Sequence, residues 1–322
     1  MAAPDRTDRD IPQRPLALIV GPTASGKSAL ALALAARLGG TIINADAMQC
    51  YAALRILTAR PSVADESQAP HRLYGVRALS QSTSAAWWRE AALAELATAT
   101  FPILCGGTGL YISALINGLA TIPPPTEAAR HEARALLAQL GPEALHKRLD
   151  PETAAKLKPQ DSQRIARAYE VLRSTGQGLA HWQSQPTQRL TGFTPRLILL
   201  DPPRDALKAA IAHRFDTMLD MGALDEVRAL LAQTPDPSLP LMRAHGVPEL
   251  AAHLRGELSL PEARARAIAA TARYTKRQAT WFRHQKPVSS TDMQIIHSRI
   301  TSATQLSESM IADLANFLNH TG

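Results

Sequence analysis

Short apolar runs separated by helical patterns organise the chain. Four runs are typical of buried strands, because polar or turn-forming residues bound each of them. They span residues 16–20, 41–45, 101–105 and 196–200. Helical periodicity lies between them at 29–38 and 84–99. Strands that alternate with helices build a parallel sheet covered on both faces, so we predict a doubly wound α/β fold.

A triple proline at 123–125 ends this alternation. From 126 to 175 the pattern is helical, with no strand signal. Its breaks lie at Gly141-Pro142, Asp150-Pro151 and Pro159. We therefore predict an all-helical insertion domain at 123–190 within an α/β core. Residues 1–122 form the first part of that core, and residues 191–322 complete it with basic C-terminal helices.

Further helical patterns follow the insertion. They span 205–220, 223–232, 259–287 and, more weakly, 307–318. Asp205 is expected to cap the first of these helices, and Ser259 forms a capping box with Glu262 at the start of the third. No chemical signal is found beyond Pro287. The polar, turn-rich segment 58–70 is expected to be a mobile loop.

The first strand leads directly into a glycine loop of the pattern G-x-x-x-x-G-K-[ST]. Its residues are Gly21, Pro22, Thr23, Ala24, Ser25, Gly26, Lys27 and Ser28. Glycines let the backbone approach an anion closely, and the N–H groups at the start of the next helix favour negative charge. Lys27 adds a cation, and the Ser28 hydroxyl can bind Mg²⁺. The motif predicts a P-loop NTPase-like fold and a polyphosphate ligand, ATP being the usual one, but no particular reaction.

Two more strand ends carry polar side chains. Asp46 follows the second strand, and Thr108 lies in the glycine loop 106–109 after the third. In doubly wound folds the carboxyl ends of the strands form the ligand site, so both residues are expected near the P-loop. From its position alone, Asp46 is either a helix cap or a catalytic group. Thr108 either contacts the ligand or forms part of a tight turn between strand and helix. No strand is interpreted as carrying the four apolar residues and terminal Asp of a Walker B segment, which disfavours an ATPase.

Most of the basic surplus is concentrated in one segment. The 322 residues carry a net charge of +7, and 243–286 holds nine Lys or Arg against three Glu, a net charge of +6. Within it Arg273, Lys276 and Arg277 share a helix face by their spacing, and Trp281-Phe282 follows. A basic face beside aromatic residues is typical of nucleic-acid binding. A solvated face with the aromatic residues in the core is the alternative, and it applies equally to Gln163 and Arg167 on the helix that Asp161 caps.

Other classes of protein are disfavoured. Two cysteines, Cys50 and Cys105, cannot build a disulfide framework, and we interpret them as small buried hydrophobic residues. The ten histidines show no zinc-ligand spacing. The first fifteen residues are polar and unlike a signal peptide, and no apolar run approaches the roughly 20 residues of a membrane span. We expect a cytoplasmic protein without a membrane partner.

Several segments resemble the tRNA dimethylallyltransferases, also called tRNA delta(2)-isopentenylpyrophosphate transferases, and occur in the order of that family. They are 21–28, 44–49, 106–111, 161–170 and 274–283. The likeness covers about 16–286. The sequence departs from the family pattern at Ala47 (usually Ser), Leu57 (usually Gly), Arg60 (usually Lys) and Val247-Pro248 (usually Tyr-Lys). The last departure leaves the role of 243–250 in tRNA contact open.

The resemblance implies transfer of a dimethylallyl group from dimethylallyl diphosphate to N6 of adenosine 37, in tRNAs that read codons beginning with U. The P-loop would then hold a diphosphate leaving group, together with Arg214 and with Mg²⁺ on Ser28. Asp46 would be the general base, and Thr108 would orient the reactants. The residues implied in tRNA binding are Asp46, Ala47, Met48, Gln49, Thr108, Arg130, Gln163, Arg164, Ile165, Ala166, Arg167, Arg273, Lys276 and Arg277. We expect a monomer.

Two other classes stay open on the residues alone. A P-loop kinase of a small metabolite would consume ATP. A non-catalytic RNA-binding protein would bind tRNA and need no prenyl donor. Related prenyltransferases that act on free adenylates share the P-loop motif. Their substrate is small, so they have little need for a basic segment such as 243–286.

Overall fold

The computed structural model describes residues 13–302 and 306–320. It divides the chain into two compact units, which are considered separately below. The core unit comprises the residues up to Ile116 together with those from Leu190 on, and the helical unit comprises Asn117–Arg189. The predicted insertion, 123–190, began six residues later than the helical unit does.

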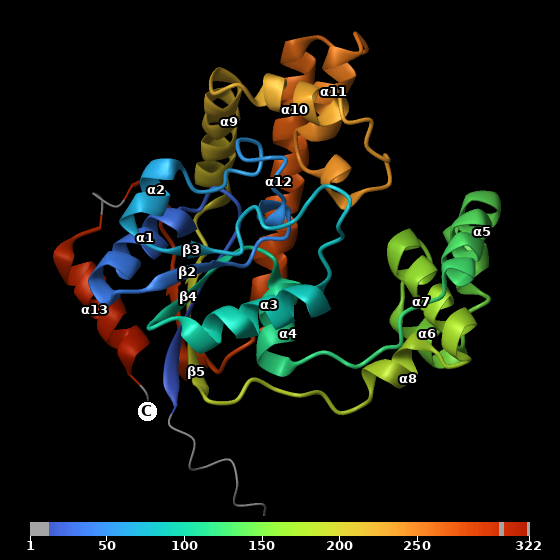
Figure 1. Cartoon of the computed structure of the whole chain (residues 1–322), viewed down its shortest axis with the longest axis horizontal. Helices are drawn as coiled ribbons and strands as arrows, with labels where there is room; N and C mark the ends of the chain where they lie inside the picture. Colours follow the sequence, from blue (N-terminus) through green and yellow to red (C-terminus); the bar gives the residue numbers. More distant parts are fainter. Residues whose placement is uncertain (1–12, 303–305, 321–322) are drawn as a thin grey trace, which may run out of the picture. The chain divides into compact units, whose positions relative to one another are not determined.

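A parallel sheet of six strands forms the centre of the core unit (Figure 1). The strand order is β3-β2-β4-β1-β5-β6. The strands are β1 (Arg14–Val20), β2 (Thr41–Asn44), β3 (His71–Arg72), β4 (Pro102–Gly106), β5 (Phe193–Leu200) and β6 (Met293–Ile296). Leu18 of β1 pairs with Leu104 on one side and with Leu197 on the other. This confirms the predicted doubly wound α/β fold.

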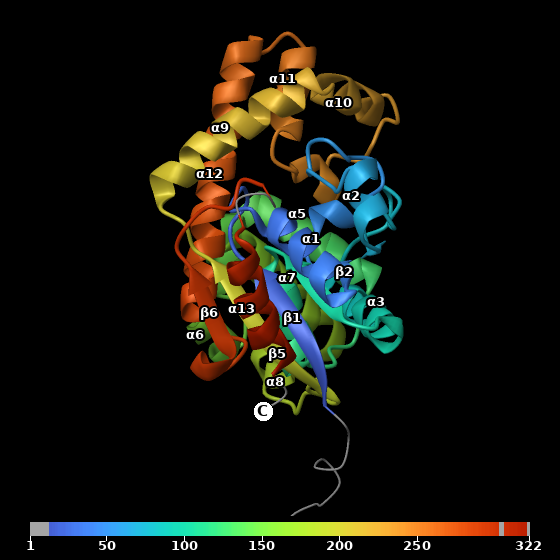
Figure 2. The same cartoon turned by 90° about the vertical axis from the view of Figure 1, so that its left-hand side faces the viewer.

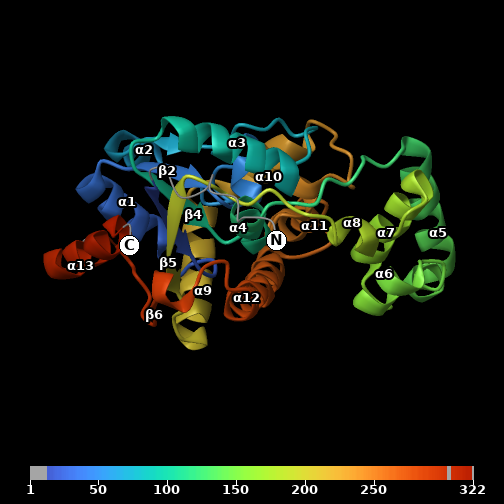
Figure 3. The same cartoon turned by 90° about the horizontal axis from the view of Figure 1, so that it is seen from below.

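Helices cover the two faces of the sheet (Figures 2 and 3), and a separate hydrophobic cluster lies on each face. On one face Ile19 packs with residues of α1 (Lys27–Leu38) and α13 (Glu308–Asn319). On the other face α3 (Ala85–Thr98), α4 (Gly109–Asn117) and the end of α12 (Leu260–His284) bury Trp88 and Phe282. The Trp88 ring stacks on Tyr111 with ring centroids 4.6 Å apart. The two layers leave the carboxyl ends of the strands open for a ligand site.

A third apolar cluster joins the remaining helices of the core unit to the segment after β2. It includes Tyr51, Leu54, Phe215 and Leu250. The helices are α9 (Arg204–Asp220), α10 (Ala223–Leu231), α11 (Val247–Leu254) and the first half of α12. Short 3₁₀ turns lie at Met48–Cys50, Pro240–Arg243 and Ser290–Asp292. The Ser259–Glu262 capping box begins α12 as predicted, and the helix ends at His284 rather than near 287.

The helical unit consists of four helices, in agreement with the predicted pattern. They are α5 (Glu127–His146), α6 (Pro151–Lys156), α7 (Ser162–Thr175) and α8 (Leu179–Gln183). Gly141 has non-helical dihedral angles inside α5, and Asp150 and Asp161 cap α6 and α7 with their side chains. Ala133, Leu145 and Ile165 are fully buried in its core.

Some predictions about elements were wrong. The segment 58–70, expected to be a loop, contains α2 (Val63–Gln68), which a Ser62–Asp65 capping box stabilises. The strands β3 and β6 and the helix α11 were missed, because two- to eight-residue elements carry little periodicity. Asp205 does not cap α9; Pro203 is the N-cap residue, and Asp205 lies in the first turn. Among the described helices none is both long and apolar enough to span a membrane.

Candidate active site

The P-loop, the segment after β2 and the loop after β4 meet at one edge of the sheet, because all the strands are parallel. They form a cleft of about 410 Å³, here called the P-loop cleft. Its lining includes Thr23, Ala24, Gly26, Lys27, Ser28, Asp46, Gln49, Arg60, Asp65, Arg214 and Arg299. Gly21, Pro22 and Ser25 are buried behind this surface. Most of the predicted diphosphate-binding residues are therefore brought together.

Two glycines are required by the shape of the P-loop. Gly21 has a φ of 146°, and a Cβ there would lie 2.4 Å from the Leu200 carbonyl oxygen. Gly26 has a φ of 102°, and a Cβ there would lie 2.0 Å from the Ile300 carbonyl oxygen. Gly26 is also the N-cap of α1, which has no side-chain cap, so the first N–H groups of that helix stay available to an anion.

Asp46 is fixed by its neighbours after β2. Its backbone N–H donates to Asn44 Oδ1 at 2.8 Å, and its Oδ1 accepts from the Met48 N–H at 3.0 Å. Asn44 is fully buried, and its Nδ2 donates to the Asp46 and Leu73 carbonyl oxygens. Asp46 thus stabilises the local turn with its side chain and also lines the cleft. It is not a helix cap, because Ala47 is the N-cap residue of the turn Met48–Cys50, which has no side-chain cap.

Opposite charges converge in the P-loop cleft. Burial raises the pKa of Asp46, and the nearby Lys27, the Met48 and Gln49 N–H groups and Arg214 oppose this shift. Burial lowers the pKa of Lys27 to about 8, although Cys105 and Asp46 act in the opposite direction. The Lys27 Nζ donates to the Pro22 carbonyl oxygen at 2.8 Å. Perturbed titratable groups that share a cleft are typical of a catalytic site.

Thr108 and Gln278 connect the loops around Asp46. The Thr108 Oγ1 accepts from the Ala47 N–H at 3.1 Å. Gln278, on α12 and only 4% exposed, accepts from the Thr23 N–H at 2.9 Å and donates to the Gly107 carbonyl oxygen at 3.1 Å. Gln278 belongs to a recognised motif, but spacing along a helix gave no sign that it links the two glycine loops.

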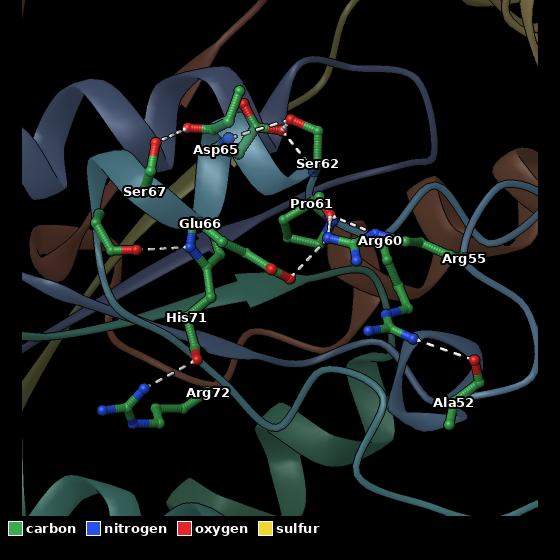
Figure 4. A network of polar contacts seen from close by, with 12 residues as sticks. Ala52, Arg55, Arg60, Pro61, Ser62, Asp65, Glu66, Ser67, His71 and Arg72 are labelled. Carbon is green, nitrogen blue, oxygen red and sulfur yellow. Dashed lines mark hydrogen bonds and ion pairs between the residues drawn. The ribbon is translucent and has the colours of Figure 1, made fainter. Parts of the chain in front are cut away.

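Residues 58–61 and Asp65 form another wall of the cleft. Figure 4 shows the polar contacts that hold this part of the chain. Arg55 bonds the Pro61 carbonyl oxygen and pairs with Glu66 at 3.0 Å, and Ser62 bonds Asp65. The Gln49 amide donates to the carbonyl oxygens of Thr58 and Ala59 at 2.8 and 3.0 Å, so it holds this wall. The resemblance implied Gln49 in tRNA binding, whereas here its Nε2 is hydrogen-bonded within the protein.

Two cationic side chains of α12, Arg277 and Lys276, have different surroundings. Arg277 lies over the Tyr274 ring, 5.4 Å from its centroid, and His245 lies 4.9 Å from the same ring. Lys276 instead lines a separate cleft of about 190 Å³ between α9 and α12. Arg273, Lys276 and Arg277 are all exposed on α12, and their predicted role in tRNA binding stays a prediction. Phe282 is buried, which supports the core alternative for that residue.

The predicted tRNA residues of the helical unit lie on α5 and α7. Gln163 and Arg164 are exposed, whereas Ile165 is fully buried and supports the helix from inside. Arg130, Arg164 and Arg167 pair with acidic residues one turn away, at 2.5, 3.6 and 3.6 Å. Exposed ion pairs of this kind contribute little to stability, so the arginines can exchange partners readily.

Two features near the C-terminal part of the fold were not anticipated. Arg299, beyond the last predicted chemical signal, lines the P-loop cleft and donates to the Ala24 carbonyl oxygen at 2.9 Å. The expectation that no strand carries a Walker B pattern was wrong at β5, because Asp201 directly follows its four apolar residues 197–200. Both Asp201 oxygens, however, accept from Arg283 at 3.0 Å. No sequence pattern separates Arg299 from a surface arginine.

The cleft offers hard oxygen ligands to Mg²⁺. Ser28 is exposed at its surface, and the Asp46 carboxylate lies in the same lining. Within residues 13–302 and 306–320 no group of three or more His, Cys, Asp or Glu side chains gathers to hold a metal. The residues therefore fit an ion that keeps water and takes most of its ligands from a phosphate, as Mg²⁺ commonly does.

Comparison with known proteins gives a consistent result. The family model described as "IPP transferase" matches residues 49–285. A tRNA dimethylallyltransferase of Acidiphilium cryptum is 62% identical over 96% of both chains, and one of Granulibacter bethesdensis is 60% identical over 93% of this chain and 96% of the relative. The crystal structure of a tRNA isopentenylpyrophosphate transferase from Bacillus halodurans, 30% identical, covers 95% of this chain and 96% of its own with a TM-score of 0.66.

Proposed function

The chain belongs to the IPP transferase family of tRNA dimethylallyltransferases, and we propose that its P-loop cleft holds dimethylallyl diphosphate for transfer to an adenine of tRNA. The enzyme is a prenyltransferase that modifies tRNA. The observation that supports this use of the cleft is the convergence of a P-loop, Lys27 and Arg214 with the Asp46 carboxylate.

The donor side of the reaction requires stabilisation of a leaving group. The bond between the allylic carbon and the diphosphate oxygen breaks, and negative charge grows on the diphosphate. Lys27, Arg214 and the N–H groups at the start of α1 are positioned to bind this charge. Mg²⁺, held by Ser28 and the diphosphate, would neutralise part of the same charge when bound.

The acceptor side requires a base. We assign that role to Asp46, which would take a proton from the exocyclic N6 amine while the new C–N bond forms. The proposed acceptor is adenosine 37 of tRNAs that read codons beginning with U. A stacked adenine must leave its loop to reach the cleft, as it does in enzymes that act on flipped bases. Thr108, bonded to the Ala47 N–H, would keep the loop after β2 in register for this step.

We assign tRNA binding to residues of both units. Arg273 and Arg277 of α12 would contact phosphates, and Arg130 and the exposed residues of 163–167 would do the same from the helical unit. Contacts of this kind weaken steeply with salt. We further propose that the enzyme acts as a monomer in the cytoplasm, where its tRNA substrate is available.

One assay separates this proposal from its alternatives. The protein is incubated with unmodified tRNA, Mg²⁺ and labelled dimethylallyl diphosphate, with and without ATP. Label that enters the RNA without ATP supports the proposal, and mapping the label to N6 of adenosine 37 supports the proposed position. ATP consumption without labelling would indicate a kinase. RNA binding with neither activity would indicate a non-catalytic binding protein.

A further inference from the structure

The segment that follows β6 reaches the P-loop cleft from a part of the chain outside the family match, which ends at 285. β6 pairs in parallel with β5, and the Asp201 N–H donates to the Ile296 carbonyl oxygen at 2.9 Å. The chain therefore leaves the sheet at the same edge as the P-loop. Arg299 and Ile300 then line the cleft, and Ile300 is anchored in the apolar layer beneath α1.

Two hydrogen bonds hold this segment against the P-loop itself. The Arg299 Nε donates to the Ala24 carbonyl oxygen at 2.9 Å, and the Ile300 N–H donates to the Ser25 carbonyl oxygen at 3.1 Å. Because the C=O and N–H of one peptide plane point in opposite directions, the bond to Ser25 directs the Gly26 N–H away from Ile300. Ala24, a non-glycine residue with a φ of 66°, is held in an uncommon conformation at this contact.

The charges around Arg299 point to an anion. Arg299 and Arg214 line the same cleft. Burial lowers the pKa of Arg214, Asp46 opposes this shift, and repulsion by Arg299 adds to it. Lys27 lies in the same lining. Cations that converge in a partly buried cleft repel one another until a polyanion binds between them, and that anion then gains the interaction with all of them.

We propose that Arg299 is a further residue of the donor site, which binds the diphosphate of the prenyl donor and fixes the P-loop around it. This inference rests on the proposed function for the identity of the donor. The guanidinium has the fork of donors that suits phosphate oxygens, and one of its nitrogens is already used to hold Ala24 in place. Arg299 thus acts on the leaving group and plays no part in recognising tRNA.

The test uses the full-length protein and inorganic diphosphate as the probe. Diphosphate affinity in the presence of Mg²⁺ is measured by titration calorimetry for the wild type, Arg299→Ala, Arg299→Lys and Arg255→Ala. Arg255 is exposed and pairs with Glu257, so its variant is the matched control. We expect Arg299→Ala to weaken diphosphate binding by at least about tenfold and to raise the KM for dimethylallyl diphosphate similarly, while its affinity for tRNA stays within twofold of the wild type.

The lysine variant keeps the inference testable if the alanine variant does not fold. If Arg299→Ala unfolds, Arg299→Lys keeps the charge and should bind diphosphate several-fold more weakly than the wild type, because a single ammonium cannot make the forked contact. Wild-type diphosphate affinity in either folded variant would overturn the inference, and so would an equal loss in Arg255→Ala. Absence of label transfer by the wild type would refute the proposed function, whereas the role of Arg299 in anion binding would still be decided by the calorimetry.

Discussion

At the scale of single residues, Asp46 combines a local structural role with the proposed chemistry. Its Oδ1 is bonded to the Met48 N–H, and the side chain lines the P-loop cleft beside Lys27. Burial alone would favour the neutral acid, but the Lys27 cation and the N–H groups favour the carboxylate. A base held between these influences can accept a proton and release it.

The variant Asp46→Asn should lower kcat by roughly 100- to 10,000-fold, the usual contribution of a general base. The asparagine oxygen can still accept from the Met48 N–H, so the fold and tRNA affinity should be retained. Single-turnover transfer of label measures the rate, and filter binding measures tRNA affinity. Asp65→Asn is the control, because Asp65 also lines the cleft but bonds Ser62. Near-normal turnover in Asp46→Asn would remove Asp46 as the base.

Lys27 gives the reaction a predicted dependence on pH. Burial lowers the pKa of Lys27 to about 8, and its cationic form would attract the diphosphate that we propose for the cleft. As pH rises through about 8 the cation is lost, so kcat/KM for the donor should fall, while kcat should fall less because bound diphosphate favours the cation. On the acid side, kcat/KM should fall as Asp46 is protonated, at a pH above the ordinary Asp pKa because burial raises the Asp46 pKa. Lys27→Arg should remove the alkaline fall, and its persistence in that variant would assign it to another group.

At the scale of elements, buried side chains from distant helices hold the loops of the site. Gln278 of α12 bonds the P-loop and the loop after β4 at once. Glu226 of α10 accepts from the N–H groups of Arg55, Ile56 and Leu57, at 2.5 to 2.9 Å, just before the wall of the cleft. Helices on the periphery of the core unit are therefore connected to the donor site through the backbone.

Replacement of Gln278 by Ala should leave the Thr23 N–H and the Gly107 carbonyl oxygen without their partner. We expect a loss of about 1–3 kcal/mol in the free energy of unfolding and a lower kcat at unchanged tRNA affinity. Urea denaturation and single-turnover kinetics measure the two effects. The control is Thr280→Ala, an exposed position on the same helix. If both variants behave like the wild type, the hydrogen bonds from Gln278 to the two glycine loops contribute neither to stability nor to turnover.

Replacement of Glu226 by Gln should act through the wall of the cleft. One carboxylate oxygen becomes an NH₂ group that cannot accept from a backbone N–H, so we expect a loss of about 1–3 kcal/mol in stability. The KM for dimethylallyl diphosphate should rise, because Thr58, Ala59 and Arg60 follow the loosened turn into the cleft. Glu90→Gln, at an exposed position of α3, is the control. An unchanged KM would mean that the wall is held without Glu226.

At the scale of the whole molecule, the sequence predicted what periodicity and local motifs carry. The P-loop with its strand and helix, the edge that bears Asp46, and the helical pattern between 126 and 175 all follow from short-range patterns. Arg299 and Glu226 could not be predicted, because their roles depend on contacts with residues 275 and about 170 positions away. The four-residue strand β6, which brings Arg299 to the site, was too short to be recognised.

The helical unit permits a test of how the two tasks of the enzyme are divided. The Leu190 N–H donates to the Ile116 carbonyl oxygen at 3.1 Å, so the ends of the core unit already lie side by side. A short Gly-Ser linker in place of 117–189 can therefore close the core with a small entropic cost. The P-loop cleft is lined entirely by core residues, and the shortened protein should keep its diphosphate affinity within about threefold.

The tRNA affinity of the shortened protein should fall by more than tenfold, and the slope of log Kd against log salt concentration should become shallower, since the phosphate contacts proposed for the helical unit would be lost. Calorimetry with diphosphate and filter binding at several salt concentrations measure the two effects. As a milder comparison, Arg164→Ala in the intact chain should weaken tRNA binding with no change in diphosphate affinity. Full tRNA affinity in the shortened protein would place RNA recognition in the core unit alone, and a joint loss of both affinities with an intact fold would show that the core needs the helical unit to form the donor site.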